Sequence, residues 1–347
     1  VLRCFDVKSD NTANGRPQLS DLAKVAGVSL ATVDRVINRR KGVKERTRKR
    51  VLDAARDIGF LSSDDAERYG RDRPMRIVVL LPAGTNPYLR LLAEIVKERV
   101  GRAAANEPFL RCFFIEGFNG SALASALRSN AAWADGIIFF AIEHPEVREA
   151  AAEVSAGGTR LVTIVSDLGH IPEIHHLGLD NRSVGRTAGL LIGRLASTQQ
   201  GSIALVAGSR HYRAHSEREA GFLSLLDEKF PKLRVIGMRE GHDDSAENYR
   251  HTLDLFEQVT DLIGIYNVGG SSNGISRAMR EAERSSLVFI GHGLTPDTRR
   301  SLLDGTMDAV FDQDPDILID QAIRHLTESR IRSRPLKLEI YFRENLP

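Results

Sequence analysis

Apolar residues between positions 19 and 60 recur at helical spacing. Leu19, Leu22, Ala23 and Ala26 are spaced i, i+3, i+4 and i+7, so they form one face of a helix over 19–26. A glycine, a valine and a serine follow, and Ser29 is placed to cap a second helix over about 30–38. A third helix is expected over about 45–58. The pattern therefore predicts three short helices, the first two joined by a tight turn.

Beyond Pro74 the pattern changes to short apolar runs that alternate with helical stretches. Strands are expected at 76–82, 109–116, 135–141, 160–166, 202–208, 233–240, 262–268, 287–293, 308–315 and 336–342. Helices are expected near 87–105, 120–131, 145–157, 181–196, 214–227, 244–259, 272–282, 295–304 and 315–329. Apolar strands that alternate with helices predict parallel sheets covered by helices on both faces. These units are too many for one doubly wound sheet, so two similar lobes are expected.

The predicted fold class is thus α plus α/β, with a three-helix helix-turn-helix unit followed by a two-lobed doubly wound α/β domain. We expect a flexible arm over 1–15, the helical domain over 16–61 and a polar linker over 62–74. The remaining chain, 75–347, forms the two lobes. One is expected to hold about 75–178 with about 305–325, and the other about 179–304 with about 326–347.

Composition narrows the class of protein. The chain is 42% apolar and 27% charged, and no run of about 18 apolar residues could span a membrane. Residues 1–14 lack the apolar core of a signal peptide. The two cysteines, Cys4 and Cys112, form neither a disulfide framework nor a metal-ligand spacing. These features favour a cytoplasmic protein without a membrane partner, and we expect no cofactor and no metal.

Charge is distributed unevenly along the chain. The net charge is only +2, yet basic residues outnumber acidic ones over 1–74 and the reverse holds over 75–347. A basic head on an acidic body is typical of nucleic-acid binding at one end. A solvated surface with no such partner would show the same charges.

The second predicted helix carries side chains suited to double-stranded DNA. A helix in this position of a helix-turn-helix enters the major groove, where Arg35 can read a guanine through two hydrogen bonds and Leu30 or Ala31 can contact a thymine methyl. Neighbouring basic and amide side chains suit phosphates. The residues expected to contact DNA are Ser29, Leu30, Ala31, Thr32, Asp34, Arg35, Asn38, Arg39, Arg40, Lys44 and Thr47. The alternative is a three-helix interaction module that binds no nucleic acid.

Three motifs carry a specific resemblance. They are L-S-D-L-A-K-V-A-G-V-S (19–29), A-T-V-D-R-V-I-N (31–38) and G-V-K-E-R-T-R-K-R-V (42–51), the last followed by I-G-F. Residues 19–61 resemble the headpiece of the lactose-repressor (LacI) family of regulators, and the rest of the chain resembles that family's periplasmic-binding-protein-like sensor. The resemblance implies a DNA-binding repressor, a homodimer on a palindromic operator, and control by a small molecule held between the lobes.

The chain departs from the family pattern in two places. Asp34 stands where the family usually has serine, so this carboxylate either pairs with a neighbouring arginine or accepts from a cytosine amine. The family's hinge inserts leucines into the minor groove, whereas residues 62–69 read S-S-D-D-A-E-R-Y. The usual kink in the DNA is therefore not expected from this hinge.

The resemblance also implies an effector site built from the loops that follow the strands. The expected residues are Asn86, Tyr88, Asp167, Arg218, Asn267, His292 and Gln313. Amides, one aspartate, one arginine and one tyrosine suit a neutral polyhydroxylated ligand, such as a monosaccharide or a polyol. Purely structural roles are also open: a turn and core position for Tyr88, a surface ion pair with Glu217 or Glu219 for Arg218, and a packing role for His292.

The same residues bear on other functions. An enzyme is disfavoured because V-G-G-S-S-N-G (268–274) lacks the G-K-[ST] of a phosphate loop and no nucleophile elbow or zinc spacing appears. A transport solute-binding protein would fit the body but not the basic head. A regulator that senses a protein partner stays open. No leucine heptad follows Phe342, so a dimer is expected and a tetramer held by a terminal coiled coil is not.

Overall fold

The computed structural model describes residues 17–38, 40, 42–61, 73–102, 107–169, 171–328 and 335–347. The chain divides into two compact units, a head that ends at Arg73 and a body that begins at Pro74. The expected arm over 1–15 and the hinge over 62–69 lie outside the described residues.

The head is a three-helix unit, as the hydrophobic spacing predicted. It contains α1 (Leu19–Ala26), α2 (Leu30–Ile37) and α3 (Glu45–Asp57). Its core is formed by small and branched side chains from all three helices, including the fully buried Leu22, Val33 and Val51. The turn between α1 and α2 requires a left-handed residue, and Gly27 supplies it with φ of 61°. The Ser29 hydroxyl then accepts a hydrogen bond from the Thr32 amide at 3.2 Å and caps α2.

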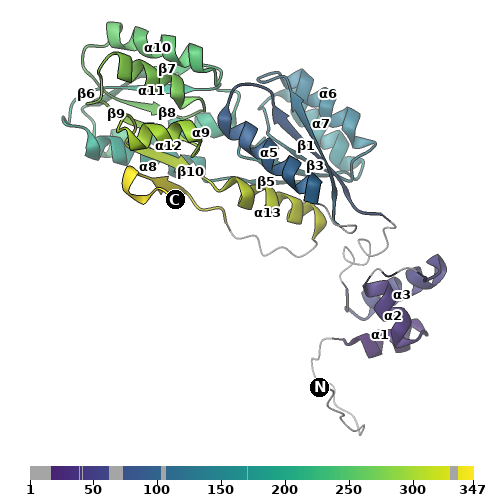
Figure 1. Ribbon diagram of the computed structural model, residues 1–347. Helices are drawn as coiled ribbons and strands as arrows, with labels where there is room; N and C mark the ends of the chain where they lie inside the picture. Colours follow the sequence, from purple (N-terminus) through teal and green to yellow (C-terminus); the bar gives the residue numbers. More distant parts are fainter. Residues whose placement is uncertain are drawn as a thin grey trace. The chain divides into compact units, whose positions relative to one another are not determined.

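The first lobe of the body is built on a five-stranded parallel sheet. The elements are β1 (Arg76–Pro82), α5 (Pro87–Arg102), β2 (Phe109–Ile115), α6 (Gly120–Ala131), β3 (Gly136–Phe139), α7 (Pro145–Ala156), β4 (Arg160–Ile164) and β5 (Ile174–Leu177). The strand order is β2-β1-β3-β4-β5. Helix α5 and a later helix, α13 (Pro315–Thr327), lie on one face, with α6 and α7 on the other (Figure 1).

The second lobe is built on a six-stranded sheet. Its elements are α8 (Asn181–Leu195), β6 (Gly201–Ala207), α9 (Arg213–Lys229), β7 (Leu233–Glu240), α10 (Ser245–Gln258), β8 (Leu262–Asn267), α11 (Ser272–Glu281), β9 (Val288–His292), α12 (Pro296–Leu303), β10 (Ala309–Asp312), β11 (Glu339–Tyr341) and the short 3-10 helix η1 (Arg343–Asn345). The order is β11-β10-β9-β8-β6-β7, and only β11 runs antiparallel to its neighbour.

Burial explains why these strands read as continuous apolar runs. All seven residues of β6 are buried, as are six of the seven in β1. A strand covered by helices on both faces has no solvent-facing side, so it shows no polar alternation. The two-lobed α/β architecture is therefore confirmed. No helix within the described residues is long and apolar enough to cross a membrane.

Two features differ from the sequence-based expectation. The strand β5 was not expected, because I-H-H-L contains two histidines and only its last residue is buried. The expected range 305–325 also placed β10 in the first lobe, whereas β10 pairs with β9 and β11 in the second. The chain returns to the first lobe only after Asp312, because α13 is the part that packs there.

Candidate functional site

The outer face of α2 in the head carries exposed polar and apolar side chains. Leu30 is 53% exposed, and Ala31, Arg35 and Asn38 are also exposed, whereas Thr32 is half-buried beneath the Ser29 cap. The spacing of these residues places them along one side of the helix. Four of the expected DNA contacts are therefore accessible on a single helical surface.

Asp34 is engaged within the head itself. Its carboxylate accepts a hydrogen bond from Asn38 Nδ2 at 2.7 Å and forms an ion pair with Arg40 at 3.0 Å. Of the two roles expected for this departure from the family pattern, pairing with a neighbouring arginine is the one present. The pair is exposed, so it contributes little to stability. Its main effect is to neutralise a carboxylate that would otherwise repel phosphates.

The remaining expected DNA contacts lie at and beyond the end of α2. Lys44 is exposed at the start of α3, and Thr47 is half-buried in the first turn of that helix. Arg39 lies outside the described residues.

The body contains a pocket at the carboxyl ends of the strands of both lobes. Its empty volume is about 510 Å³, including solvent at its mouth. Strand ends of open α/β sheets are where such folds bind ligands. The lining combines apolar and aromatic side chains with polar ones: Asn86, Tyr88, Leu89, Phe140, Val165, Leu179, His215, Arg218, Asp243, Gly269, Gly270, His292, Gly293, Phe311, Asp312 and Gln313. Five of the seven residues expected at the effector site are among them.

Asn86 and Tyr88 connect the two lobes across this pocket. Asn86 directly precedes α5 of the first lobe and Tyr88 is the second residue of that helix, and Asn86 Oδ1 accepts from the Tyr88 amide at 3.0 Å. Asn86 Nδ2 donates to Asp243 Oδ2 of the second lobe at 2.9 Å. The Tyr88 hydroxyl donates to the Gln313 carbonyl at 3.1 Å, and burial raises the pKa of that hydroxyl. The phenol therefore stays neutral, and its ring forms one wall of the pocket.

Arg218 is a buried cation held by neutral acceptors. Only 5% of it is exposed, and its Nε donates to Asn181 Oδ1 at 2.8 Å while Nη1 donates to the Val268 carbonyl at 2.7 Å. Burial lowers its pKa. The surface ion pairs considered for it belong to other arginines, since Glu217 pairs with Arg213 and Glu219 with Arg210.

Two histidines line the pocket in the neutral form. His292 Nε2 lies 2.9 Å from the Tyr266 hydroxyl, and burial holds the pKa of His292 well below its usual value. His215 Nδ1 lies 2.9 Å from the Ser209 carbonyl, and burial lowers the pKa of His215 to about 4. Neither imidazole carries charge near neutral pH, so each offers a hydrogen-bonding nitrogen rather than a cation.

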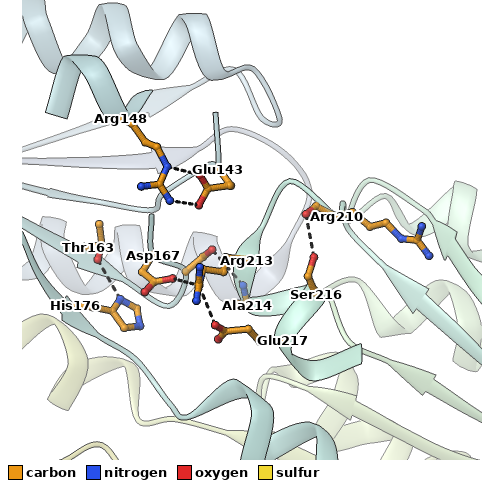
Figure 2. Close-up of polar contacts among 11 residues, drawn as sticks. Glu143, Arg148, Thr163, Asp167, His176, Arg210, Arg213, Ala214, Ser216 and Glu217 are labelled. Carbon is orange, nitrogen blue, oxygen red and sulfur yellow. Dashed lines mark hydrogen bonds and ion pairs between the residues drawn. The ribbon is translucent and has the colours of Figure 1, made fainter. Parts of the chain in front are cut away.

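The other two expected residues, Asp167 and Asn267, do not line the pocket. Asp167 Oδ1 lies 3.2 Å from Arg213 Nε, which also bonds Glu217 at 2.8 Å (Figure 2). Asn267 is fully buried and donates to the Gly270 carbonyl and the Ser272 hydroxyl, both at 2.9 Å. Asp167 is therefore used in an ion pair, and Asn267 shapes the glycine-rich loop that follows β8.

Three polar lining residues were not predicted: His215, Asp243 and Asp312. Asp243 follows β7 and has a φ of 52°, and its Oδ1 accepts from the Gly270 amide at 2.7 Å. The signal for Asp243 was present, because E-G-H-D-D follows a strand just as the other site loops do. Asp312 ends β10 beside the predicted Gln313 and could have been found from the same motif. His215 lies one turn before Arg218 on α9, so helical spacing could have found it.

Comparison with known protein families agrees with both units. The family described as "Bacterial regulatory proteins, lacI family" matches residues 18–63, and "Periplasmic binding protein domain" matches residues 77–328. The body belongs to the periplasmic-binding-protein family, and the head is a LacI-family domain. The first match covers α1, α2 and α3, and the second covers the strands that surround the pocket.

Curated relatives of this chain are named as regulators. Catabolite control protein A of Streptococcus mutans is 38% identical over 74 residues, which is 21% of this chain and 22% of that protein. The HTH-type transcriptional repressor PurR of Erwinia tasmaniensis is 27% identical over 247 residues, 69% of this chain and 68% of that protein. The segments aligned with the first relatives span about a fifth of their length.

Solved structures share the fold of the body. A solute-binding protein from Burkholderia graminis, in complex with D-arabinose, superposes with a TM-score of 0.71 at 18% identity, covering 79% of this chain and 97% of that one. A LacI transcriptional regulator from Bacteroides fragilis gives a TM-score of 0.70 at 16% identity, covering 79% and 98%. At these identities the likeness shows the fold alone.

Proposed function

We propose that the protein is a transcriptional repressor, which binds an operator through its head and is released by a small molecule bound in its body. The observation that carries the proposal is the exposed face of α2, with Arg35 accessible, within a head that matches the LacI family. Relatives named as repressors support the direction of control. The protein acts where DNA is, in the cytoplasm, and it binds its ligand without catalysing a reaction.

The effector belongs to the class of monosaccharides and polyols. Tyr88, Phe140 and Phe311 give the pocket aromatic walls, and Arg218, Gln313 and the two neutral histidines supply hydrogen-bonding groups. A sugar ring offers an apolar face to aromatic rings and hydroxyls to polar groups. Sugar-bound proteins of the same fold, such as the D-arabinose complex, support this class.

The protein acts as a homodimer, because two heads are needed to bind the two halves of a palindromic operator. A candidate contact lies on the first lobe, where β2 is an edge strand. Phe109 is 55% exposed, Phe113 40% and Phe114 46%. An exposed apolar edge strand offers unpaired backbone and apolar area to a second copy.

The DNA-binding half of the proposal is tested with an operator selected from a random duplex library by the full chain. Arg35→Ala should weaken binding to that operator by ~1–3 kcal/mol and relax preference at one base pair in each half-site. Arg56→Ala is the matched control, since Arg56 lies at the end of α3 and pairs with Asp53. Unchanged discrimination by the Arg35 variant would remove it from base readout. A flat salt dependence would argue against DNA binding.

The effector half is tested by thermal denaturation of the full chain with pentoses, hexoses, polyols and sugar acids. A ligand that binds only the folded state raises the melting temperature. A shift with one sugar class supports the proposal, and addition of that sugar should then release the selected operator. Absence of a shift with every compound would instead favour a regulator that responds to a protein partner.

A further inference from the structure

One end of the pocket carries two buried acceptor atoms, one on Asp312 and one on Gln313. Asp312, the last residue of β10, is 8% exposed, and Gln313 beside it is 5% exposed. Asp312 Oδ1 and Gln313 Oε1 are buried and have no hydrogen-bond partner among the described residues. Buried polar atoms are rarely left unpaired in folded proteins, because each costs the free energy of its lost hydration. Both residues line the pocket, so a bound ligand can supply the missing donors.

The charges around Asp312 are of its own sign. Burial is the main cause that raises the pKa of Asp312 to about 7; repulsion from Glu339 and Asp314 adds to it, whereas the backbone amides of Leu294 and Gln313 lower it. Among the described residues, no ion pair joins Asp312 to a cationic side chain. A buried carboxylate without a counter-charge is unfavourable in a low-dielectric pocket.

Arg218, the buried cation of the pocket, is not a counter-ion of Asp312. Arg218 is bonded to Asn181 and to the Val268 carbonyl, and the charged groups that act on it do not include Asp312. His215 and His292 are neutral because burial lowers the pKa of both. The acidic end of the pocket therefore has no positive partner among the residues that the structure describes, and a bound ligand can supply one.

We propose that the effector carries a cationic amine, which Asp312 binds as a counter-ion while Gln313 Oε1 accepts a second hydrogen from it. An ammonium group has three donors and a positive charge, so it satisfies both orphaned oxygens and compensates the carboxylate. A hydroxyl can supply a hydrogen bond but no charge. The ligand class is an amino sugar or an aminated polyol. This inference rests on the proposed effector function and narrows it.

The rest of the pocket fits such a ligand. Tyr88 lies close enough to Asp312 for the carboxylate to raise the Tyr88 pKa, after burial, which is the larger cause. Tyr88 and Phe311 both line the pocket. Aromatic faces attract cations and pack against sugar rings. The Tyr88 hydroxyl is already committed to the Gln313 carbonyl, so it positions the acidic end and leaves the Gln313 side chain for the ligand.

The test compares matched ligands on the full chain by calorimetry at pH 7. The pairs are D-glucosamine with D-glucose, D-galactosamine with D-galactose, and D-mannosamine with D-mannose. Charge-assisted hydrogen bonds are about twice as strong as neutral ones, so in at least one pair the amine should bind about tenfold more tightly or better. The N-acetyl derivative of that amine keeps the ring but not the charge and should lose this advantage.

Two variants separate charge recognition from general effects. Asp312→Asn should reduce the preference for the amine to less than about twofold. Asp320→Asn is the matched control, because Asp320 is exposed on α13 and pairs with Arg324, and it should keep the preference. If the Asp312 variant does not fold, the native protein still decides. Its preference should shrink from pH 7 to pH 5.5, since the free carboxyl then holds a proton that the amine must displace.

Each outcome has a distinct meaning. Tighter binding of the neutral member in every pair, or a preference that survives both Asp312→Asn and the lower pH, would overturn the amine proposal while leaving a sugar effector in place. No binding of any member of any pair would contradict the amine proposal, whereas the wider effector proposal would fail only if pentoses and polyols also left the melting temperature unchanged.

Discussion

Asp34 lies among basic side chains that are proposed to contact phosphates, yet it is bound to Asn38 and Arg40. Replacing it with alanine removes one negative charge and releases Arg40 for a phosphate. We therefore expect Asp34→Ala to tighten binding to non-specific duplex DNA and to steepen the plot of log affinity against log salt by about one. Fluorescence anisotropy across a salt series measures both quantities.

Asp53→Ala provides the control for this experiment. Asp53 also lies in the head and pairs with an arginine, at 3.2 Å, so its loss changes the net charge equally. If both variants steepen the salt dependence alike, the effect is one of overall charge, and release of Arg40 is not its cause.

Asp312 should make stability depend on pH. Its pKa in the folded protein is about 7, above its ordinary value of 3.8. A raised folded pKa stabilises the protein fully below about pH 4, and this stabilisation is lost as the pH rises through about 7. Asp312→Asn should therefore unfold at a higher temperature than the native chain at pH 8. The gain is on the order of a few kcal/mol at most, and it should vanish near pH 4.

Melting temperatures of the ligand-free proteins across pH 4 to 8 check this prediction. Asp320→Asn should follow the native curve, because Asp320 lies on α13 away from the pocket and pairs with Arg324. A native-like pH profile for Asp312→Asn would mean that Asp312 is not the buried carboxylate described above.

At the scale of elements, two loops hold the lobes together without ligand. Asp243, after β7, accepts from Asn86 at the start of α5, and its carbonyl accepts from the Thr85 hydroxyl at 3.0 Å. Asn86→Ala removes the side-chain link, so the ligand-free body should populate a more open state. Small-angle scattering should show a larger radius of gyration for this variant. Asn130→Ala, which removes a bond confined to the first lobe, should leave the radius unchanged.

The same loops show what the sequence could predict and what it could not. Continuous apolar runs predicted β1 and β6, because strands buried on both faces have no polar side. Helical spacing of apolar residues predicted the helices of the head, because each buries one face. The edge strand β5 was not predicted, because its two half-buried histidines leave no alternation of apolar and polar residues. The lobe to which β10 belongs depends on pairing with β9, and pairing between distant strands leaves no local signal.

For the pocket, too, local patterns were predictable and contacts between distant segments were not. Tyr88, Arg218, His292 and Gln313 were expected there, since strand ends of such sheets gather ligand contacts. Asp167 was expected on the same ground, but Arg213 of the other lobe lies 3.2 Å away and engages it. That partner comes from a distant part of the chain, so no spacing within the sequence could reveal the ion pair.

At the scale of the whole molecule, the proposed function requires two copies. Phe113 is exposed on the edge strand β2, and Phe113→Glu places a charge where a second copy would bury apolar area. We expect the variant to sediment as a monomer at concentrations where the native chain is a dimer. Operator affinity should fall with it, because one head can then contact only one half-site and the gain from linked binding is lost.

Ile236→Glu is the matched change on the other lobe, since Ile236 is 41% exposed on the edge strand β7. If the dimer forms through β2, this control should keep both the mass and the operator affinity of the native chain. Loss of the dimer in the β7 variant alone would place the contact on the second lobe. A β2 variant that is monomeric yet binds the operator with native affinity would instead show that one head suffices, and the two-copy requirement would fail.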